Sequence, residues 1–258
     1  MGIGSAIAKA LVSESANLIL LARSADKLTE LSRELKQAAG GDDTLKIFPC
    51  VCDVRSASSV TEAITNIVSQ TGPINTLVNN AGLALGAPRP FHKLTLDEID
   101  TMTGTNLSGM LYVTHAVLNA GKMLTLPTAT ILNVTSVTGL ELPPFPGESI
   151  YHTTKAAQEA FTNALRVELT GTNVRVLALR PGVVATHFHR QRVAYDDEEY
   201  EGFMRGFEPL NPEQVARSAV WMLKMEEGVS VKSLDVVPTG QRSLQVFDRE
   251  WNQRHAKG

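Results

Sequence analysis

Tyr151 and Lys155 are four positions apart in the segment Tyr-His-Thr-Thr-Lys. On a helix, residues with this spacing lie on one face, one turn apart. A phenol has a pKa of about 10 in water, and a nearby ammonium group lowers it because opposite charge stabilises the phenolate. The pair therefore predicts a tyrosine that donates or accepts a proton closer to neutral pH. Taken alone, the segment also fits an ordinary surface Tyr–Lys pair.

Ser136 and Asn106 are polar residues in places where their types are informative. Ser136 follows the apolar segment 129–134, and a hydroxyl at the carboxyl end of a parallel strand faces the ligand crevice. Asn106 and Gly109 lie inside a long helical pattern, although both are poor helix formers. A capping serine and a tolerated kink are the alternative interpretations.

The hydrophobic pattern alternates between helices and strands along the chain. Helical spacing covers 5–15, 25–38, 58–70, 96–120, 150–169 and 212–225, and short apolar runs typical of strands cover 17–22, 45–51, 75–78, 129–134, 174–179 and 233–237. Such alternation indicates an α/β fold, with a doubly wound parallel sheet covered by helices on both faces. No linker or repeat interrupts it. We therefore expect one domain over residues 1–258, with a substrate loop at about 186–210.

Composition excludes several classes of protein. The 258 residues include 24 Lys and Arg against 27 Asp and Glu, a near balance that argues against nucleic-acid binding. No apolar run approaches the roughly 18 residues of a membrane span, and no signal-peptide pattern opens the chain. The two cysteines, Cys50 and Cys52, lack further ligands nearby for a metal site, and they favour a reducing, cytoplasmic setting.

The ordered set of motifs resembles the short-chain dehydrogenase/reductase family. The matching pieces, which span nearly the whole chain, are Gly2-Ile3-Gly4, Asp53, Asn79-Asn80-Ala81-Gly82, Asn106, Ser136, Tyr151-x-x-x-Lys155 and Pro181-Gly182 with Thr186. The resemblance implies a Rossmann-like sheet and a nicotinamide dinucleotide cofactor. It also implies hydride transfer between that cofactor and a small-molecule carbonyl or secondary alcohol.

By this resemblance, each matching residue takes a role. Tyr151 is the general acid/base, Ser136 holds the substrate oxygen, Lys155 lowers the Tyr151 pKa and binds the nicotinamide ribose, and Asn106 supports a relay water. The residues implied at the cofactor are Gly2, Ile3 and Gly4 at the pyrophosphate, Asp53 at the adenine, Asn79, Ala81 and Gly82 along the adenosine, and Pro181, Gly182, Val184 and Thr186 beside the nicotinamide.

The chain departs from the family pattern at two places. Residues 140–149, between Ser136 and Tyr151, form a longer connection than is usual, which we expect to change the pocket wall and not the chemistry. The glycine-rich turn lacks the Thr-Gly and the strand that precede it in the family. We therefore expect the sheet to lack that first strand, between the strands at 17–22 and 75–78, as in an N-terminally truncated member.

Arg23 indicates which cofactor is used. Enzymes of this fold that use NAD place a carboxylate at the end of the second strand, where it binds the ribose 2′-hydroxyl. Here Arg23 follows that strand, and a guanidinium pairs with the 2′-phosphate of NADP. The sequence thus favours NADP over NAD. The alternative is that Arg23 merely caps the strand edge.

Three segments narrow the resemblance. Residues 77–86, 180–184 and 234–239 are similar to NADP-dependent 3-hydroxy acid dehydrogenases that oxidise serine-like or allo-threonine-like substrates. Arg190 or Arg192 would then meet the substrate carboxylate, although either could be a solvated loop charge. By the same analogy we expect a homodimer or homotetramer.

The sequence is also compatible with two other functions. One is a catalytically silent dinucleotide-binding or scaffold protein on the same fold, which the shortened glycine turn favours. The other is a carbonyl reductase of secondary metabolism that does not act on hydroxy acids. The complete set of Tyr151, Lys155, Ser136 and Asn106 favours the enzyme over the silent protein.

Overall fold

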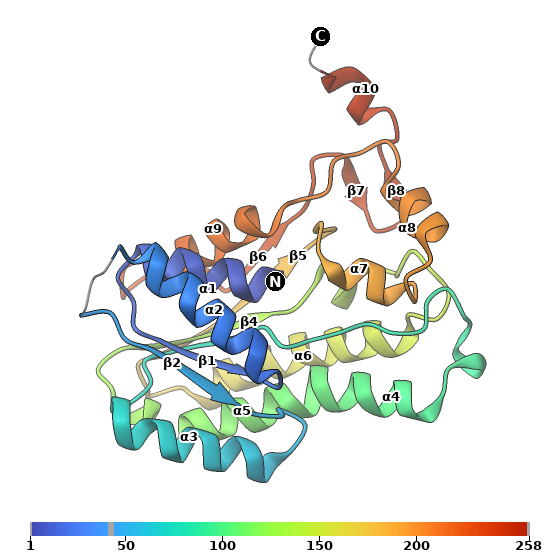
Figure 1. Ribbon diagram of the computed structural model, residues 1–258. Helices are drawn as coiled ribbons and strands as arrows, with labels where there is room; N and C mark the ends of the chain where they lie inside the picture. Colours follow the sequence, from blue (N-terminus) through green and yellow to red (C-terminus); the bar gives the residue numbers. More distant parts are fainter. Residues whose placement is uncertain (1, 41–43, 257–258) are drawn as a thin grey trace.

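The computed structural model describes residues 2–40 and 44–256 of the chain. Parallel strands alternate with helices that cover them, as Figure 1 shows. The strands are β1 (Leu18–Ala22), β2 (Ile47–Val51), β3 (Thr76–Asn79), β4 (Ala129–Val134), β5 (Val174–Pro181) and β6 (Ser233–Val236), followed by a hairpin of β7 (Gln241–Ser243) and β8 (Val246–Phe247). The predicted doubly wound α/β fold is confirmed.

The helices are α1 (Ile3–Ser13), α2 (Ala25–Ala38), α3 (Ala57–Thr71), α4 (Leu96–Thr103), α5 (Gly109–Leu118), α6 (Ser149–Glu168), α7 (His187–Arg192), α8 (Asp197–Met204), α9 (Pro212–Leu223) and α10 (Trp251–His255). Five of the predicted helices, α1, α2, α3, α6 and α9, begin and end within about two residues of their predicted positions, while α7, α8 and α10 were not predicted. Short 3-10 turns cover Phe91–Lys93, Met123–Thr125 and Val137–Gly139. None of the described helices is long and apolar enough to span a bilayer.

The parallel strands form two separate sheets. β1 pairs with β2, and β3, β4, β5 and β6 form a four-stranded sheet in that order. Within the described residues, β1 and β3 are not hydrogen-bonded to each other, in agreement with the interruption expected between them.

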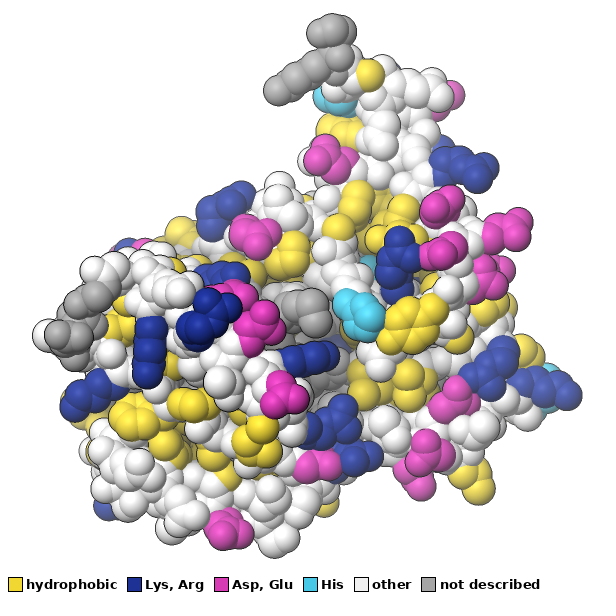
Figure 2. Space-filling model, in the orientation of Figure 1, with side chains coloured by type: hydrophobic (Ala, Val, Ile, Leu, Met, Phe, Trp, Pro, Cys, Tyr) yellow, Lys and Arg dark blue, Asp and Glu magenta, His cyan; other side chains and the backbone are white. Residues whose placement is uncertain are grey.

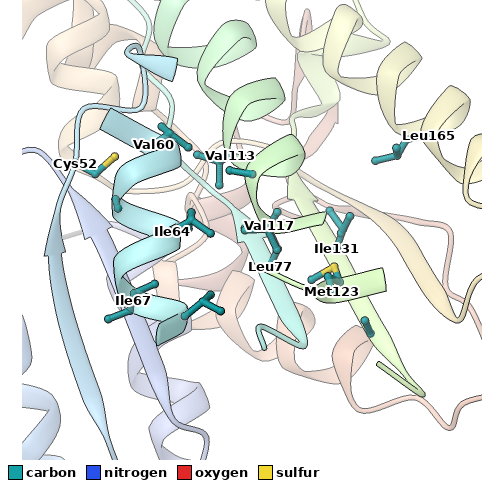
Figure 3. Close-up of a cluster of buried hydrophobic side chains, with 14 of the residues drawn as sticks. Cys52, Val60, Ile64, Ile67, Leu77, Val113, Val117, Met123, Ile131 and Leu165 are labelled. Carbon is teal, nitrogen blue, oxygen red and sulfur yellow. The ribbon is translucent and has the colours of Figure 1, made fainter. Parts of the chain in front are cut away.

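Both faces of the sheets are covered by helices. Neighbouring residues of β4 point to opposite sides, as the pleat of a strand requires: Ile131 packs with α3, α5 and α6, and Leu132 packs with α1 and α9. Figure 3 shows the first of these clusters, in which Val60, Ile64 and Val117 meet the strands. Ile19 and Leu21 of β1 pack against the same cluster, so one core joins the two sheets.

The helix predicted over 96–120 is interrupted in the structure. A π-helical turn, Gly104–Ser108, separates α4 from α5 and contains Asn106. Such turns insert a residue into the helix and are frequent at functional sites. Asn and Gly were the signal in the sequence, since neither favours a regular helix.

The segment 186–210, expected as a loop, contains α7 and α8. The Asp196 side chain caps α8 by accepting a hydrogen bond from the Glu199 N–H at 3.1 Å, and such caps stabilise a helix start. Ala194 and Tyr195, with positive φ, form the turn between the two helices. These short, polar helices have no apolar periodicity of their own. β7, β8 and the projecting α10 (Figure 1) were not predicted either.

Gly139 fixes how closely the turn after β4 packs on α6. A Cβ placed there would lie 2.9 Å from the Lys155 carbonyl oxygen, which belongs to the helix backbone and cannot move alone. We expect Gly139→Ala to lower the free energy of unfolding by about 1–3 kcal/mol, the usual cost of overpacking. Urea denaturation measures it, with Gly228→Ala, a site with open space, as the control. Equal stability of both variants would contradict this packing.

Candidate active site

Tyr151 lies in the first turn of α6, with only 7% of its surface exposed. The Lys155 Nζ is 5.8 Å from the centre of its ring, one turn along the same helix. Ser136, at the carboxyl end of β4, interacts with the phenol through a hydrogen bond that lowers the Tyr151 pKa. The sequence-predicted Tyr, Lys and Ser are therefore brought together at one end of the sheet.

The expected shift of the Tyr151 pKa toward neutrality is wrong in this structure. Burial raises the pKa of Tyr151 to about 12, because the phenolate loses its hydration. The positive charge of Arg192 and the hydrogen bond from Ser136 oppose this increase. The phenol is therefore protonated at neutral pH, as a proton donor must be.

Lys155 is a buried ammonium group whose hydrogen bonds are all made within the protein. Its Nζ donates to the Val134 carbonyl at 3.2 Å and to Gln158 Oε1 at 3.0 Å. Burial lowers the Lys155 pKa to about 8, against the stabilising charge of Glu159. The pKa of Lys155 thus falls close to physiological pH.

Gln158 is a site residue that sequence reasoning missed. It is 2% exposed, and its Nε2 donates to the Asn106 carbonyl at 2.5 Å while its Oε1 accepts from Lys155. One side chain therefore links the ammonium group to the π-helical turn. The available signal was a glutamine on the inward face of a helix, three residues after Lys155.

Asn106 is fully buried and holds the segment after β3 in place. Its Oδ1 accepts from the Leu83 N–H at 2.8 Å, and its Nδ2 donates to the Leu83 carbonyl at 2.8 Å and to Thr154 Oγ1 at 3.1 Å. These contacts connect Thr154 of α6 with the Leu83 backbone. The relay water that the resemblance assigns to Asn106 stays a prediction.

The start of α1 packs against two other predicted cofactor segments. A Cβ on Gly4 would lie 2.5 Å from Asn80 Nδ2, and one on Gly2 would lie 3.9 Å from Thr186 Cγ2. Gly2 has φ of 84°, a conformation that favours glycine. The free N–H groups at the start of α1, from Ile3 onward, form a region that attracts phosphate.

Residues 79–82 run from the protein interior to the surface at the carboxyl end of β3. The Asn79 Nδ2 donates to Thr114 Oγ1 and to Asn133 Oδ1, both at 2.9 Å, so this side chain ties β3 to β4 and α5. Ala81 and Gly82 are exposed. The Asn79 side chain is thus engaged within the protein, and the adenosine contacts predicted for Asn79, Ala81 and Gly82 stay predictions.

Arg23 and Asp53 follow β1 and β2, which end at the same edge. Asp53 accepts hydrogen bonds from the Arg55 side chain at 2.9–3.2 Å, and these bonds, with a smaller contribution from Arg23, hold the pKa of Asp53 below its usual value. Arg23 is exposed. Figure 2 shows Lys and Arg side chains gathered in the middle of this face, near where β1 and β2 end.

The loop after β5 is held by the segments that follow it. Gln241 Oε1 accepts from the Val183 N–H at 3.0 Å, and Val184 forms a bridge with Leu210. A Cβ on Gly182 would lie 2.5 Å from the same Gln241 oxygen, so only glycine fits. Pro181 ends β5, and Gly182, Val184 and Thr186 follow it on this braced loop, so their contact with the nicotinamide stays a prediction.

The substrate side of Tyr151 is largely apolar. Leu83, Ala84 and Met102 cluster with it, and the Phe188 ring of α7 lies 5.5 Å from the Tyr151 ring. Arg192, also on α7, forms an ion pair with Glu148, and both side chains are almost fully buried. Burial raises the pKa of Glu148, and the charge of Arg192 opposes that increase. Arg190 pairs with Asp197 at the surface.

The site residues fit a nicotinamide dinucleotide by their own geometry. The glycines at the start of α1 lie beside Asn80 and Thr186, and exposed Gly82 and Arg23 follow β3 and β1, so all of them are at the carboxyl ends of the strands. Ligands of such sheets bind at this edge. At the same end of the sheet a buried phenol has a hydroxyl and an ammonium group beside it, which is suited to proton transfer to a substrate oxygen.

Comparison with known proteins agrees with this arrangement. The chain is 37% identical over 240 residues to sulfoacetaldehyde reductase 2 of Chromohalobacter salexigens, covering 93% of this chain and 91% of the relative. It is 32% identical over 241 residues to NADP-dependent 3-hydroxy acid dehydrogenase YdfG of Escherichia coli K12, covering 93% and 92%.

A solved structure of the closed form of serine dehydrogenase complexed with NADP+ is also similar. It superimposes with a TM-score of 0.83 at 32% identity, covering 94% of this chain and 93% of that chain. The family profile described as short chain dehydrogenase matches residues 1–197. The chain therefore belongs to the short-chain dehydrogenase/reductase family.

Proposed function

We propose that this protein is an NADP-dependent oxidoreductase that interconverts a carbonyl compound and the corresponding secondary alcohol. The observation that carries the proposal is the protonated, buried Tyr151 with Ser136 and Lys155 beside it. A silent scaffold has no need for such a group, whose burial costs stability. The similarity to reductases and dehydrogenases supports the enzyme as well.

In the reductive direction, the substrate carbonyl oxygen accepts a proton from the Tyr151 Oη. Ser136 orients that oxygen with its hydroxyl, and the Lys155 ammonium stabilises the phenolate that forms. NADPH, when bound, supplies the hydride that the carbonyl carbon receives. A phenol that is protonated at neutral pH carries the proton that this step transfers.

The cofactor is assigned to NADP by Arg23. A guanidinium at the end of β1 attracts the 2′-phosphate, whereas NAD would need a carboxylate there. The relatives named as NADP-dependent, and the similar structure with bound NADP+, support this choice. Gly2, Ile3 and Gly4 would hold the pyrophosphate, and Pro181, Gly182, Val184 and Thr186 the nicotinamide end.

The names of two relatives denote anionic substrates, a 3-hydroxy acid and sulfoacetaldehyde. A 3-hydroxy acid and its 3-oxo form are therefore one substrate pair to test. A neutral carbonyl compound is the second candidate. The observation that favours a neutral substrate is the ion pair of Arg192 with Glu148. Because Glu148 already neutralises this buried cation near Tyr151, Arg192 is not free to bind a substrate anion.

We further propose that the whole chain acts as one dinucleotide-binding domain in the cytoplasm, with residues 186–210 as its substrate segment. The free thiols of Cys50 and Cys52 support a reducing setting. We also propose a homodimer or homotetramer. Val167 on α6, with 72% of its surface exposed, supports a contact between copies.

Tyr151→Phe keeps the ring and removes the transferable proton. We expect turnover to fall by about 10²–10⁴-fold, the typical contribution of a general acid. NADPH affinity, measured by fluorescence titration, should change little because the ring still fills its place. NADPH oxidation followed by absorbance with a panel of carbonyls gives the rate. Near-normal turnover in the variant would remove Tyr151 from the mechanism.

Arg23→Asp should shift the preference from NADP toward NAD. It removes a phosphate partner worth about 1.5–3 kcal/mol and adds a repelling charge. The ratio of kcat/KM for the two cofactors should therefore fall by roughly 10–100-fold. Arg217→Asp, the same charge change on the exposed surface of α9, is the control. If both variants keep the wild-type ratio, another group reads the 2′ position.

Gln158→Leu removes the acceptor for the Lys155 ammonium at nearly constant volume. The charged form of Lys155 loses a hydrogen bond, so its pKa should fall below the present value of about 8. Activity that needs the protonated Lys155 is lost as the pH rises through the Lys155 pKa. In the pH profile of kcat/KM, the decrease on the basic side should therefore move by about one pH unit to lower pH.

Thr162→Val is the matched control for Gln158→Leu. Thr162 is equally buried and donates to the Gln158 carbonyl at 2.7 Å, but it has no hydrogen bond to Lys155. It should cost stability and leave the pH profile in place. An unchanged basic limb in Gln158→Leu would mean that Gln158 only fills space.

A further inference from the structure

Arg192 and Phe188 are positioned by the same face of α7. They are four residues apart, so they point the same way. Phe188 lies against Tyr151, and Arg192 pairs with Glu148, which precedes α6 directly. Two contacts, one apolar and one ionic, therefore fasten α7 to the first turn of the helix that carries Tyr151.

The guanidinium of Arg192 is enclosed on several sides. Its side chain is 7% exposed, and its guanidinium carbon lies 4.7 Å from the centre of the Phe145 ring and 5.5 Å from that of Phe203. Its Nη1 donates to His189 Nδ1 at 3.2 Å, which burial keeps neutral by lowering the His189 pKa to about 3. Its Nε faces the Glu148 carboxylate.

Glu148 is equally enclosed, with 2% of its side chain exposed. Besides Arg192, the Phe145 backbone opposes the rise of the Glu148 pKa that burial causes. The two opposite charges cancel in a region of low dielectric, so the pair presents no net charge to a ligand near Tyr151. A substrate anion would have to replace Glu148 at Arg192 and leave a carboxylate buried without a partner, which is strongly unfavourable.

We propose that Glu148, by occupying Arg192, makes the site selective for neutral carbonyl substrates and disfavours those with a carboxylate or sulfonate near the reacting carbon. The inference rests on the proposed oxidoreductase function and specifies its substrate class. Glu148 lies in the segment 140–149, where the chain departs from the family pattern. The walls formed by Leu83, Met102 and Phe188 suit an apolar substituent.

Two pairs of compounds test this selectivity. Acetoacetate and methyl acetoacetate carry the same ketone and differ in the charge of the neighbouring group, as do succinic semialdehyde and its methyl ester for an aldehyde. The wild-type kcat/KM with NADPH should favour the ester of each active pair by at least about 10-fold. Equal or better turnover of the acids by the wild-type enzyme overturns the proposal.

Glu148→Gln keeps the shape of the side chain and removes its charge. The ratio of acid to ester kcat/KM should rise by roughly 10–100-fold, the effect of one charge-assisted hydrogen bond. In the double variant Glu148→Gln with Arg192→Gln, the ratio of acid to ester kcat/KM should fall back toward the wild-type value, because no unpaired cation remains. Asp197→Asn, which releases the exposed Arg190 of the same segment, is the matched control and should leave it unchanged.

A folded Glu148→Gln variant with the wild-type ratio would overturn the proposal. Thermal unfolding and NADPH titration establish that each variant is folded and binds the cofactor. If Glu148→Gln alone does not fold, the wild-type ratio and the double variant decide. Failure of the proposed function has a different result, namely no NADPH oxidation by the wild-type enzyme with any of the four compounds.

Discussion

The structure around the site depends on the cost of burying a charged lysine next to a phenol. Lys155 is 4% exposed, so its ammonium needs partners within the protein. The β4 carbonyl of Val134 and the side chain of Gln158 provide them. Because one partner belongs to the sheet and the other to α6, the helix must keep a fixed position against β4 for the charge to remain stabilised.

Other buried polar contacts maintain that position. Asn133 Nδ2 donates to Thr162 Oγ1 at 2.8 Å, and Thr135 Oγ1 donates to Glu159 Oε1 at 2.5 Å, so two more residues at the end of β4 hold α6. Arg180 on β5 lies near the Glu159 carboxylate, at 3.6 Å. A buried polar network specifies one geometry when all its members are satisfied. The strand end and the helix therefore form a rigid support for Ser136 and Tyr151.

The sequence predicted those parts of the fold and site that rest on local patterns. The strand at 129–134 and the helix near 150–169 follow from apolar runs and spacing, and they place Ser136, Tyr151 and Lys155 together once the sheet is parallel. The order of the family motifs predicted the other site residues, such as Asn106 and the residues assigned to the cofactor. Gln158 was missed because its role depends on a carbonyl in another helix, and the ion pair of Glu148 with Arg192 because it joins distant segments.

The sign of the Tyr151 pKa shift was the other error, and its cause is also tertiary. Spacing on a helix shows that an ammonium group is near, but not how much water the phenol loses. Here α7 places Phe188 on the ring and Arg192 on the preceding turn, while Leu83 and Met102 close the other sides. The resulting dehydration outweighs the nearby positive charge and raises the pKa to about 12. The apolar walls that keep Tyr151 protonated also make any unpaired charge beside it costly. The exclusion of water by α7, Leu83 and Met102 therefore keeps the proton donor protonated and, with Arg192 paired to Glu148, underlies the proposed preference for uncharged substrates.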